Sequence, residues 1–128
     1  NFPEDMIHFV GEKNPAEVAE YMKNADFFVL FSNYENSPVV ISESLVCGKP
    51  VISTDVGGIA EHINETNGIL IPARDENMLF ESLNFMLDHF QDYDAEKLKR
   101  EAVEKFSMKN VGKTIAQQYE KILGKNSE

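Results

Sequence analysis

The sequence has no tryptophan, a single cysteine and no long apolar run. Because Cys47 has no partner for an internal disulfide, the sequence favours a reducing compartment and predicts a cytoplasmic location. Three histidines without ligand-like spacing and one cysteine give no basis for a zinc site. No stretch reaches the ~18 apolar residues of a membrane helix, and no signal-peptide pattern opens the chain. We therefore expect no transmembrane segment and no bound metal.

Positive charge is also scarce. Twelve Lys and Arg residues face 22 Asp and Glu residues, which gives a formal net charge of -10. A surface of this sign repels nucleic acid phosphates, so nucleic acid is not expected as a partner. A negatively charged ligand would have to be held by local backbone dipoles, which are found at helix N-termini and glycine turns.

The chain of 128 residues has room for one compact domain. Its first two-thirds alternates short β-rich runs with helical stretches. Strands are predicted at residues 7–10, 27–31, 51–54 and 69–71, and helices at about residues 14–22, 38–47 and 60–63. This alternation predicts parallel βαβ units. We therefore expect an α/β fold with a Rossmann-like parallel sheet of about four strands flanked by helices.

The last third of the chain is predicted to be helical. Apolar residues recur at helical spacing from Leu79 to Phe90 and from Leu98 to Phe106, and Ser107 is a plausible N-cap for a final helix. Asp92-Tyr93-Asp94 lies between two of these helices and is predicted to form a turn and a helix cap. Cys47 is expected to be a small buried thiol.

Ligands of open parallel sheets bind beyond the carboxyl ends of the strands. Residues 11–14, 32–37 and 55–58 follow predicted strands and should share this edge. In the middle loop, Ser37 is a good N-cap and Pro38 suits the first helical position. Because the third position is Val40 and not an acid, the amides of Val39 and Val40 could meet an anion such as a diphosphate. The alternative is an ordinary capped helix whose amides meet water.

Two glutamates and a glycine pair could complete a ligand site at the same edge. Glu43 lies between apolar residues of the helix, where its carboxylate could accept hydrogen bonds from a vicinal diol such as that of ribose. Glu35, on the loop, could accept hydrogen bonds from sugar hydroxyls. Gly57 and Gly58 would let the backbone approach a ligand. Each feature alone also fits a solvated charge or a plain turn; their shared edge favours a binding site.

These residues resemble those of a known family, the retaining group 1 glycosyltransferases. The resemblance is most specific in the paired glutamates, Glu35 and Glu43, followed by residues 47–52 and 55–58. It extends to residues 7–11, 25–27, Glu61, the Asn67-Gly68 turn, Leu70, Pro72 and the segment from Phe106 to Tyr119, and thus covers nearly the whole chain. It implies the nucleotide-sugar-binding C-terminal domain of a two-Rossmann-domain (GT-B) enzyme.

The resemblance also implies roles for single residues. Glu35 would contact the donor sugar as the catalytic residue, and Glu43 would hold the ribose. The segment Asn36, Ser37, Pro38, Val39 and Val40 would contact the sugar and diphosphate, Val10 and Gly11 would lie by the base, and Gly57 and Gly58 would line the donor. Transfer would retain anomeric configuration, need no metal, and use an acceptor glycan or lipid-linked glycan in polysaccharide biosynthesis.

The sequence departs from the family's pattern in two ways. Family members often have Gly-Phe-Gly between the glutamates, where this chain has residues 36–40. The domain also normally begins with two earlier strands and an Arg/Lys pair, preceded by an acceptor-binding N-terminal domain. The chain is thus expected to be a fragment that is inactive alone. Its first strand would either re-pair or exchange with a second copy in a homodimer.

Two other functions compete with this interpretation. A nucleotide-sugar epimerase of the same fold would need acid and base groups that are not evident here. A non-catalytic receiver-like signalling module is also acidic and α/β, but its Lys-Pro pair follows a strand, whereas Lys49-Pro50 precedes one.

Overall fold

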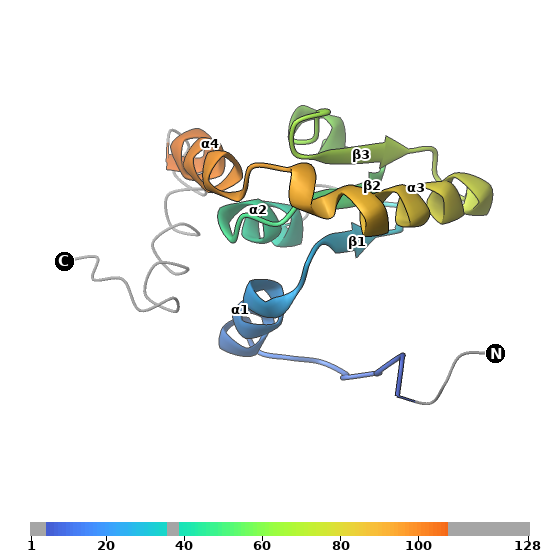
Figure 1. Cartoon of the computed structure of the whole chain (residues 1–128), viewed down its shortest axis with the longest axis horizontal. Coiled ribbons are helices and arrows are strands. Elements are labelled where there is room, and N and C mark those ends of the chain that lie inside the picture. The colour runs from blue at the N-terminus through green and yellow to red at the C-terminus, as the bar shows by residue number, and fades with distance from the viewer. Residues whose placement is uncertain (1–4, 36–38, 108–128) are drawn as a thin grey trace.

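The computed structural model describes residues 5–35 and 39–107. Its sheet has three parallel strands in the order β1-β2-β3 (Figure 1). The strands are β1 (Phe28–Leu30), β2 (Val51–Thr54) and β3 (Gly68–Ile71), and the α-helices are α1 (Pro15–Asn24), α2 (Val39–Val46), α3 (Glu76–His89) and α4 (Ala95–Ser107), with short 3-10 turns η1 (Ile59–Glu61) and η2 (Phe90–Asp92). The predicted α/β class is confirmed.

The centre of the sheet is β2. It pairs with both neighbours, Val29 lying opposite Ile52 and Ile52 opposite Ile69, and all four of its residues are buried. Successive side chains of a strand point to opposite faces. Val51 accordingly belongs to one hydrophobic cluster and Ile52 to the other. Each face of the sheet thus has its own core.

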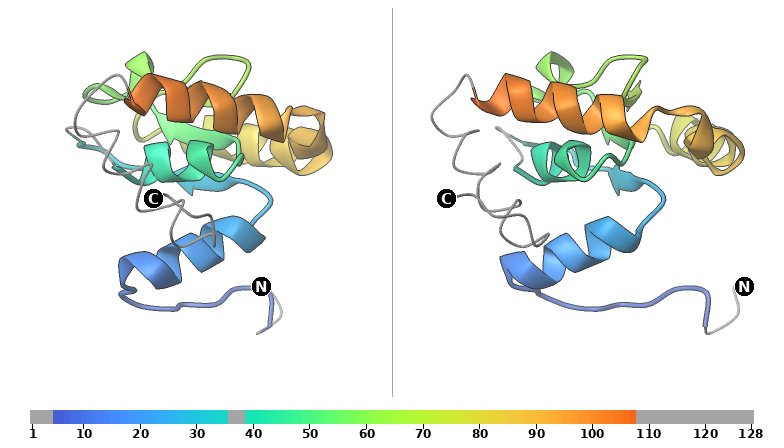
Figure 2. Two further views of the ribbon diagram at one scale, coloured as in Figure 1. Left: turned by 90° about the vertical axis from the view of Figure 1, so that its left-hand side faces the viewer. Right: turned by 60° about the vertical axis from the view of Figure 1, so that its left-hand side comes forward.

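Helices cover both faces of the sheet (Figure 2). On one face, α2 contributes Ile41 and Leu45, α1 contributes Met22, and α4 contributes Ala102. On the other face, Met86 of α3 packs with Ile52 and Ile71. The fold therefore has three layers, helix, sheet and helix, as expected for parallel βαβ units.

Local sequence explains where the helices begin and end. Asn14 Oδ1 accepts a hydrogen bond from the Glu17 amide at 2.9 Å, and the Glu17 carboxylate accepts one from the Asn14 amide at 3.2 Å, a capping box ahead of Pro15. At the end of α2, Gly48 has a φ of 78°. Its amide bonds to the Leu45 carbonyl at 2.9 Å, and the Lys49 amide bonds to the Ser44 carbonyl at 2.9 Å. This Schellman motif turns the chain into β2.

The first predicted strand, residues 7–10, is wrong. The segment forms no strand, and no backbone hydrogen bond joins it to another described residue. Phe9 is 97% exposed. This segment forms a lobe on the far side of α1 from the sheet (Figures 1 and 2). A lone strand gains neither ladder hydrogen bonds nor burial, so β-propensity alone does not stabilise it.

Two further expectations need comment. Although the run at residues 27–31 is wholly apolar, all three residues of β1 are only half-buried, because β1 pairs with β2 alone among the described strands. The re-pairing of residues 7–10 is not seen within the described part of the chain, and exchange with a second copy stays a prediction. The final helix predicted after Ser107 lies outside the described residues.

Candidate functional site

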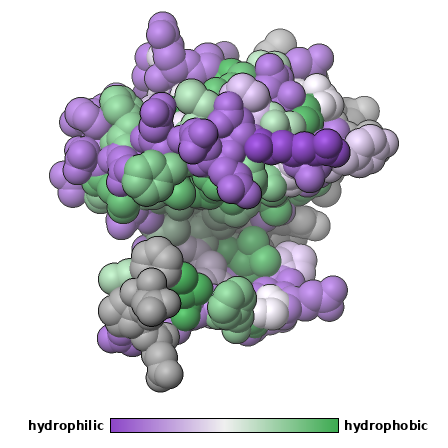
Figure 3. All heavy atoms as spheres, turned by 90° about the vertical axis from the view of Figure 1, so that its right-hand side faces the viewer, coloured by the Kyte–Doolittle hydropathy of each residue, from purple (hydrophilic) through white to green (hydrophobic). Residues whose placement is uncertain are grey.

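The carboxyl ends of the three strands lead into loops at one edge of the sheet. Residues 31–35 follow β1, residues 55–58 follow β2, and residues 72–75 follow β3. Figure 3 looks onto this edge of the molecule. Hydrophobic side chains gather in the narrow zone between the large upper body and the smaller lower part, and hydrophilic ones cover much of the upper body. Two of the three loops that were predicted to hold ligand are therefore neighbours in space.

Hydrogen bonds tie the first loop to the end of β2. Thr54 Oγ1, at the end of β2, donates to the Ser32 carbonyl oxygen at 2.7 Å. Ser32 Oγ in turn donates to Glu35 Oε1 at 2.9 Å. Glu35 is half-buried, whereas Tyr34 beside it is 80% exposed. The Glu35 carboxylate, which is predicted to bind the sugar, is thus held at the carboxyl edge through Ser32 of its own loop and Thr54 of β2.

The other glutamate, Glu43, is half-buried in the middle of α2. The first turn of α2 carries no acidic side chain, so the helix dipole there is not neutralised by a carboxylate. Val39 is 45% exposed and Val40 is half-buried. Asn36, Ser37 and Pro38 lie outside the described residues. The anion site predicted at the start of α2 stays a prediction, and the described first turn carries no acidic side chain that would oppose it.

The glycine pair forms a tight turn directly after β2. Gly57 has a φ of 56°, a conformation that a side chain disfavours, and Gly58 follows at φ -91° and ψ 12°. No described residue accepts a hydrogen bond from either amide. Consecutive amides in such a turn make a concavity that binds anions. Asp55, just before them, is fixed by its amide, which donates to the Ile71 carbonyl at 2.8 Å.

Val10 and Gly11 are not brought to this edge. They belong to the lobe beyond α1, which all three ribbon views place away from the sheet (Figures 1 and 2). Val10 is 43% exposed, and nothing lies within 4 Å of the position where a Gly11 side chain would begin. In this arrangement the structure separates these two residues from the glutamates and the glycine pair.

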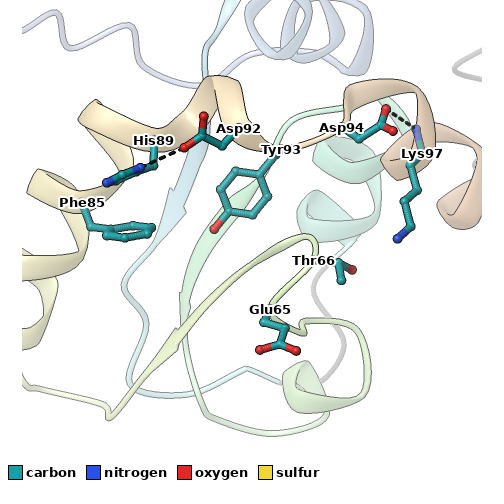
Figure 4. Close-up of a pocket in the computed structure, with 8 residues that line it drawn as sticks. All are labelled: Glu65, Thr66, Phe85, His89, Asp92, Tyr93, Asp94 and Lys97. Atoms are coloured by element: carbon teal, nitrogen blue, oxygen red, sulfur yellow. Dashed lines mark hydrogen bonds and ion pairs between the residues drawn. The ribbon is translucent and has the colours of Figure 1, made fainter.

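The chain also has a cavity of about 350 Å³ at the opposite edge of the sheet (Figure 4). The ring of His89 stacks on Phe85 at 4.2 Å, and its Nδ1 lies 2.9 Å from Asp92 Oδ2. Asp94 caps α4 by accepting a hydrogen bond from the Lys97 amide at 3.1 Å. The predicted turn and cap at residues 92–94 is confirmed. Because the facing wall, Glu65 and Thr66, precedes β3, this cavity lies apart from the carboxyl edge.

Sequence reasoning missed Ser32 and Thr54. Both are small polar residues beside apolar strands, a pattern shared by many residues without function, so only the hydrogen bonds reveal them. Cys47 is buried as predicted, and burial raises the pKa of its thiol above the ordinary value of 9.0. An unreactive thiol follows, since the thiolate is the nucleophile.

Within residues 5–35 and 39–107, no group of three or more His, Cys, Asp or Glu side chains could hold a metal ion. No helix in that part of the chain is long and apolar enough to cross a membrane.

Comparison with known proteins identifies the family. Residues 2–105 match the family model described as glycosyl transferases group 1. An uncharacterized glycosyltransferase of Methanocaldococcus jannaschii is 30% identical over 116 residues, which are 88% of this chain and 30% of that protein. The family match leaves the receiver-like alternative without support.

Solved structures agree with this match. Sucrose-phosphate synthase from Thermosynechococcus elongatus superposes with a TM-score of 0.74 and 30% identity, over 94% of this chain and 31% of that one. Anabaena HepE in complex with UDP-glucose gives a TM-score of 0.64 and 26% identity, over 84% of this chain and 29% of that one. The chain thus spans about 30% of the length of these relatives. By its sequence and by its fold, the chain belongs to the group 1 glycosyltransferase family.

Proposed function

We propose that this chain binds a nucleotide-diphosphate sugar at the carboxyl edge of its sheet and serves a retaining glycosyltransferase as its donor-binding part. The observation that carries the proposal is the single edge shared by the Glu35 loop, which Ser32 and Thr54 tie to the end of β2, and the Gly57-Gly58 turn that follows the same strand. A relative of the same fold, HepE, was solved with UDP-glucose, which supports a donor of this class.

The residues at the carboxyl edge have separate chemical roles in this proposal. Glu35 accepts hydrogen bonds from the donor sugar, and Glu43 accepts them from the ribose diol. The start of α2 at Val39 and Val40 and the amides of Gly57 and Gly58 face the diphosphate, where they stabilise the negative charge that develops on the leaving group. Val10 and Gly11 are given no role in this proposal, because their segment lies beyond α1 (Figure 1).

Transfer of the sugar to an acceptor glycan or lipid-linked glycan, with retention of configuration and without a metal, is proposed for the protein in which this chain functions. A cytoplasmic location fits such a protein, because nucleotide sugars are its substrates. The epimerase alternative has no observation in its favour, whereas the family match favours a transferase.

Isothermal calorimetry of the chain with UDP-glucose, GDP-mannose and ADP-glucose tests the proposal. We expect saturable binding of at least one of them. Glu43→Ala should weaken binding of both the nucleotide sugar and its free diphosphate, because both contain the ribose. Glu35→Ala should weaken only the nucleotide sugar. Glu65→Ala, at the opposite edge, is the matched control and should bind as the parent does. Equal binding by the parent and Glu43→Ala would contradict the proposal.

A further inference from the structure

The loop that carries Glu35 has no regular structure to hold it. Residues 31–35 lie in neither a helix nor a strand. A glutamate side chain has several rotatable bonds, so ordering its carboxylate for a ligand costs conformational entropy unless other groups hold it beforehand. The loop's own backbone makes no hydrogen bond through residues 33–35 to another described residue. Any fixed position for this carboxylate must therefore come from side-chain contacts.

Ser32 supplies the first contact. Its Oγ donates to Glu35 Oε1 at 2.9 Å, and both residues are half-buried. The two residues between them, Asn33 and Tyr34, are exposed. The hydrogen bond therefore closes the loop on itself, with its polar ends turned inward. No hydrogen bond from a described residue reaches the second carboxylate oxygen of Glu35.

Thr54 supplies the second contact and anchors the first. Thr54 is 0% exposed, and its Oγ1 donates to the Ser32 carbonyl oxygen at 2.7 Å. Thr54 belongs to β2, which is paired on both sides and is the most enclosed strand of the described sheet. A hydroxyl in that position acts as a fixed point, because the strand around it cannot shift without breaking two ladders.

We propose that Ser32 and Thr54 are positioning residues for the donor sugar: through consecutive hydrogen bonds they orient the Glu35 carboxylate so that its second oxygen faces the sugar. The inference rests on the proposed function, since it assumes that Glu35 meets the sugar. Neither residue touches the donor itself. Removing either hydroxyl should therefore weaken recognition of the sugar and leave recognition of the nucleotide unchanged.

The test compares two ligands that differ only in the sugar. Calorimetry gives the dissociation constants of UDP-glucose and UDP, and likewise of GDP-mannose and GDP. The constant of the free diphosphate divided by that of its nucleotide sugar reports the contribution of the sugar. Ser32→Ala should reduce this ratio about tenfold, which corresponds to about 1.4 kcal/mol, the order expected for a hydrogen bond to a charged group. Thr54→Val should reduce it less, because Ser32 still reaches Glu35. In both variants the dissociation constant of the free nucleoside diphosphate should stay within about twofold of the parent's value.

Conservative replacements separate positioning from folding. Ser32→Thr and Thr54→Ser keep a hydroxyl and should restore the ratio, whereas Asn33→Ala, in the same loop but exposed, should leave it unchanged. A general loss of structure would weaken UDP and UDP-glucose alike and lower the thermal midpoint. A variant that loses affinity for both ligands in that way would contradict a role confined to the sugar.

The outcomes distinguish this inference from the function on which it rests. If Glu35→Ala lowers the ratio but Ser32→Ala does not, Glu35 meets the sugar without help from Ser32, and the positioning role is wrong while the proposed function stands. If the parent chain binds neither member of either pair, both the proposed function and the positioning role are overturned. If Ser32→Ala and Glu35→Ala lower the ratio equally and the double variant adds nothing, the two residues act as one unit, as we propose.

Discussion

Residues 51–54 and residues 7–10 are two short runs of the same chain in opposite surroundings. The first run forms β2, with a strand on each side and every residue buried. The second run lies in the lobe beyond α1, has no backbone partner among the described residues, and exposes 97% of Phe9. Both runs contain isoleucine and valine, so intrinsic preference does not separate them.

The difference between them is one of neighbours. A strand is stabilised by its ladder and by cross-strand side-chain contacts, both of which require adjacent strands. β2 has two such neighbours, β1 has one and is only half-buried, and residues 7–10 have none among the described residues. Burial of these three described runs therefore follows the number of their paired neighbours.

The largest contrast should come from deleting one apolar side chain in each run. Ile52→Ala removes buried methyl groups between β2 and Met86, and should lower the free energy of unfolding by about 2–5 kcal/mol. Phe9→Ala removes an exposed ring and should change it by less than about 0.5 kcal/mol. Chemical denaturation followed by circular dichroism measures both. Equal losses would show that residues 7–10 are buried in solution and would break the comparison.

A methyl group added to a glycine sharpens the same contrast. A Cβ on Gly68 would lie 2.2 Å from the Val51 carbonyl oxygen, a backbone atom that can move only if β2 and β3 separate. Gly68→Ala should therefore cost about 3 kcal/mol of unfolding free energy. Gly11→Ala meets nothing within 4 Å and should cost only the strain of its φ of 71°, about 1 kcal/mol. Thermal denaturation measures the stability of the two variants. A larger loss of stability in Gly11→Ala than in Gly68→Ala would contradict the prediction.

The packed body should also lose stability at alkaline pH. Burial raises the pKa of the Cys47 thiol above 9.0 and that of Tyr93 above 10.0. Each group releases its proton more readily in the unfolded chain, so its contribution is complete below the unfolded pKa and is lost as pH rises through the folded pKa. Unfolding free energy should fall above about pH 9 in the parent. Cys47→Ala should flatten the first part of that decline, and an unchanged slope would contradict the assignment.

The smallest expected effect is a gain. Arg74 follows β3 at the carboxyl edge with a φ of 65°, a conformation that favours glycine. Arg74→Gly should relieve that strain and raise the free energy of unfolding by roughly 0.5 kcal/mol, after the entropy of a more flexible unfolded chain is subtracted. Arg74→Ala, which keeps a Cβ, is the matched control and should show no gain. A loss of stability in Arg74→Gly would mean that the arginine side chain makes a stabilising contact.

The sequence by itself determined the local features of this protein. Asn14 and Pro15 start α1, Gly48 ends α2, and Val51–Thr54 forms a strand, because each depends on short-range preferences that neighbouring residues reinforce. The edge of the sheet that would hold a ligand, with Glu35 on it, was also predictable, because parallel strands place their carboxyl ends together.

Only the tertiary structure decided the rest. Whether residues 7–10 form a strand depends on adjacent strands, which a local pattern cannot supply, so the strand predicted there is wrong. The hydrogen bonds from Thr54 to Ser32 and from Ser32 to Glu35 likewise escaped prediction, because the first joins residues 22 positions apart. Contacts between distant residues are set by how strands align, and that alignment minimises the energy of the whole sheet rather than of any segment read alone.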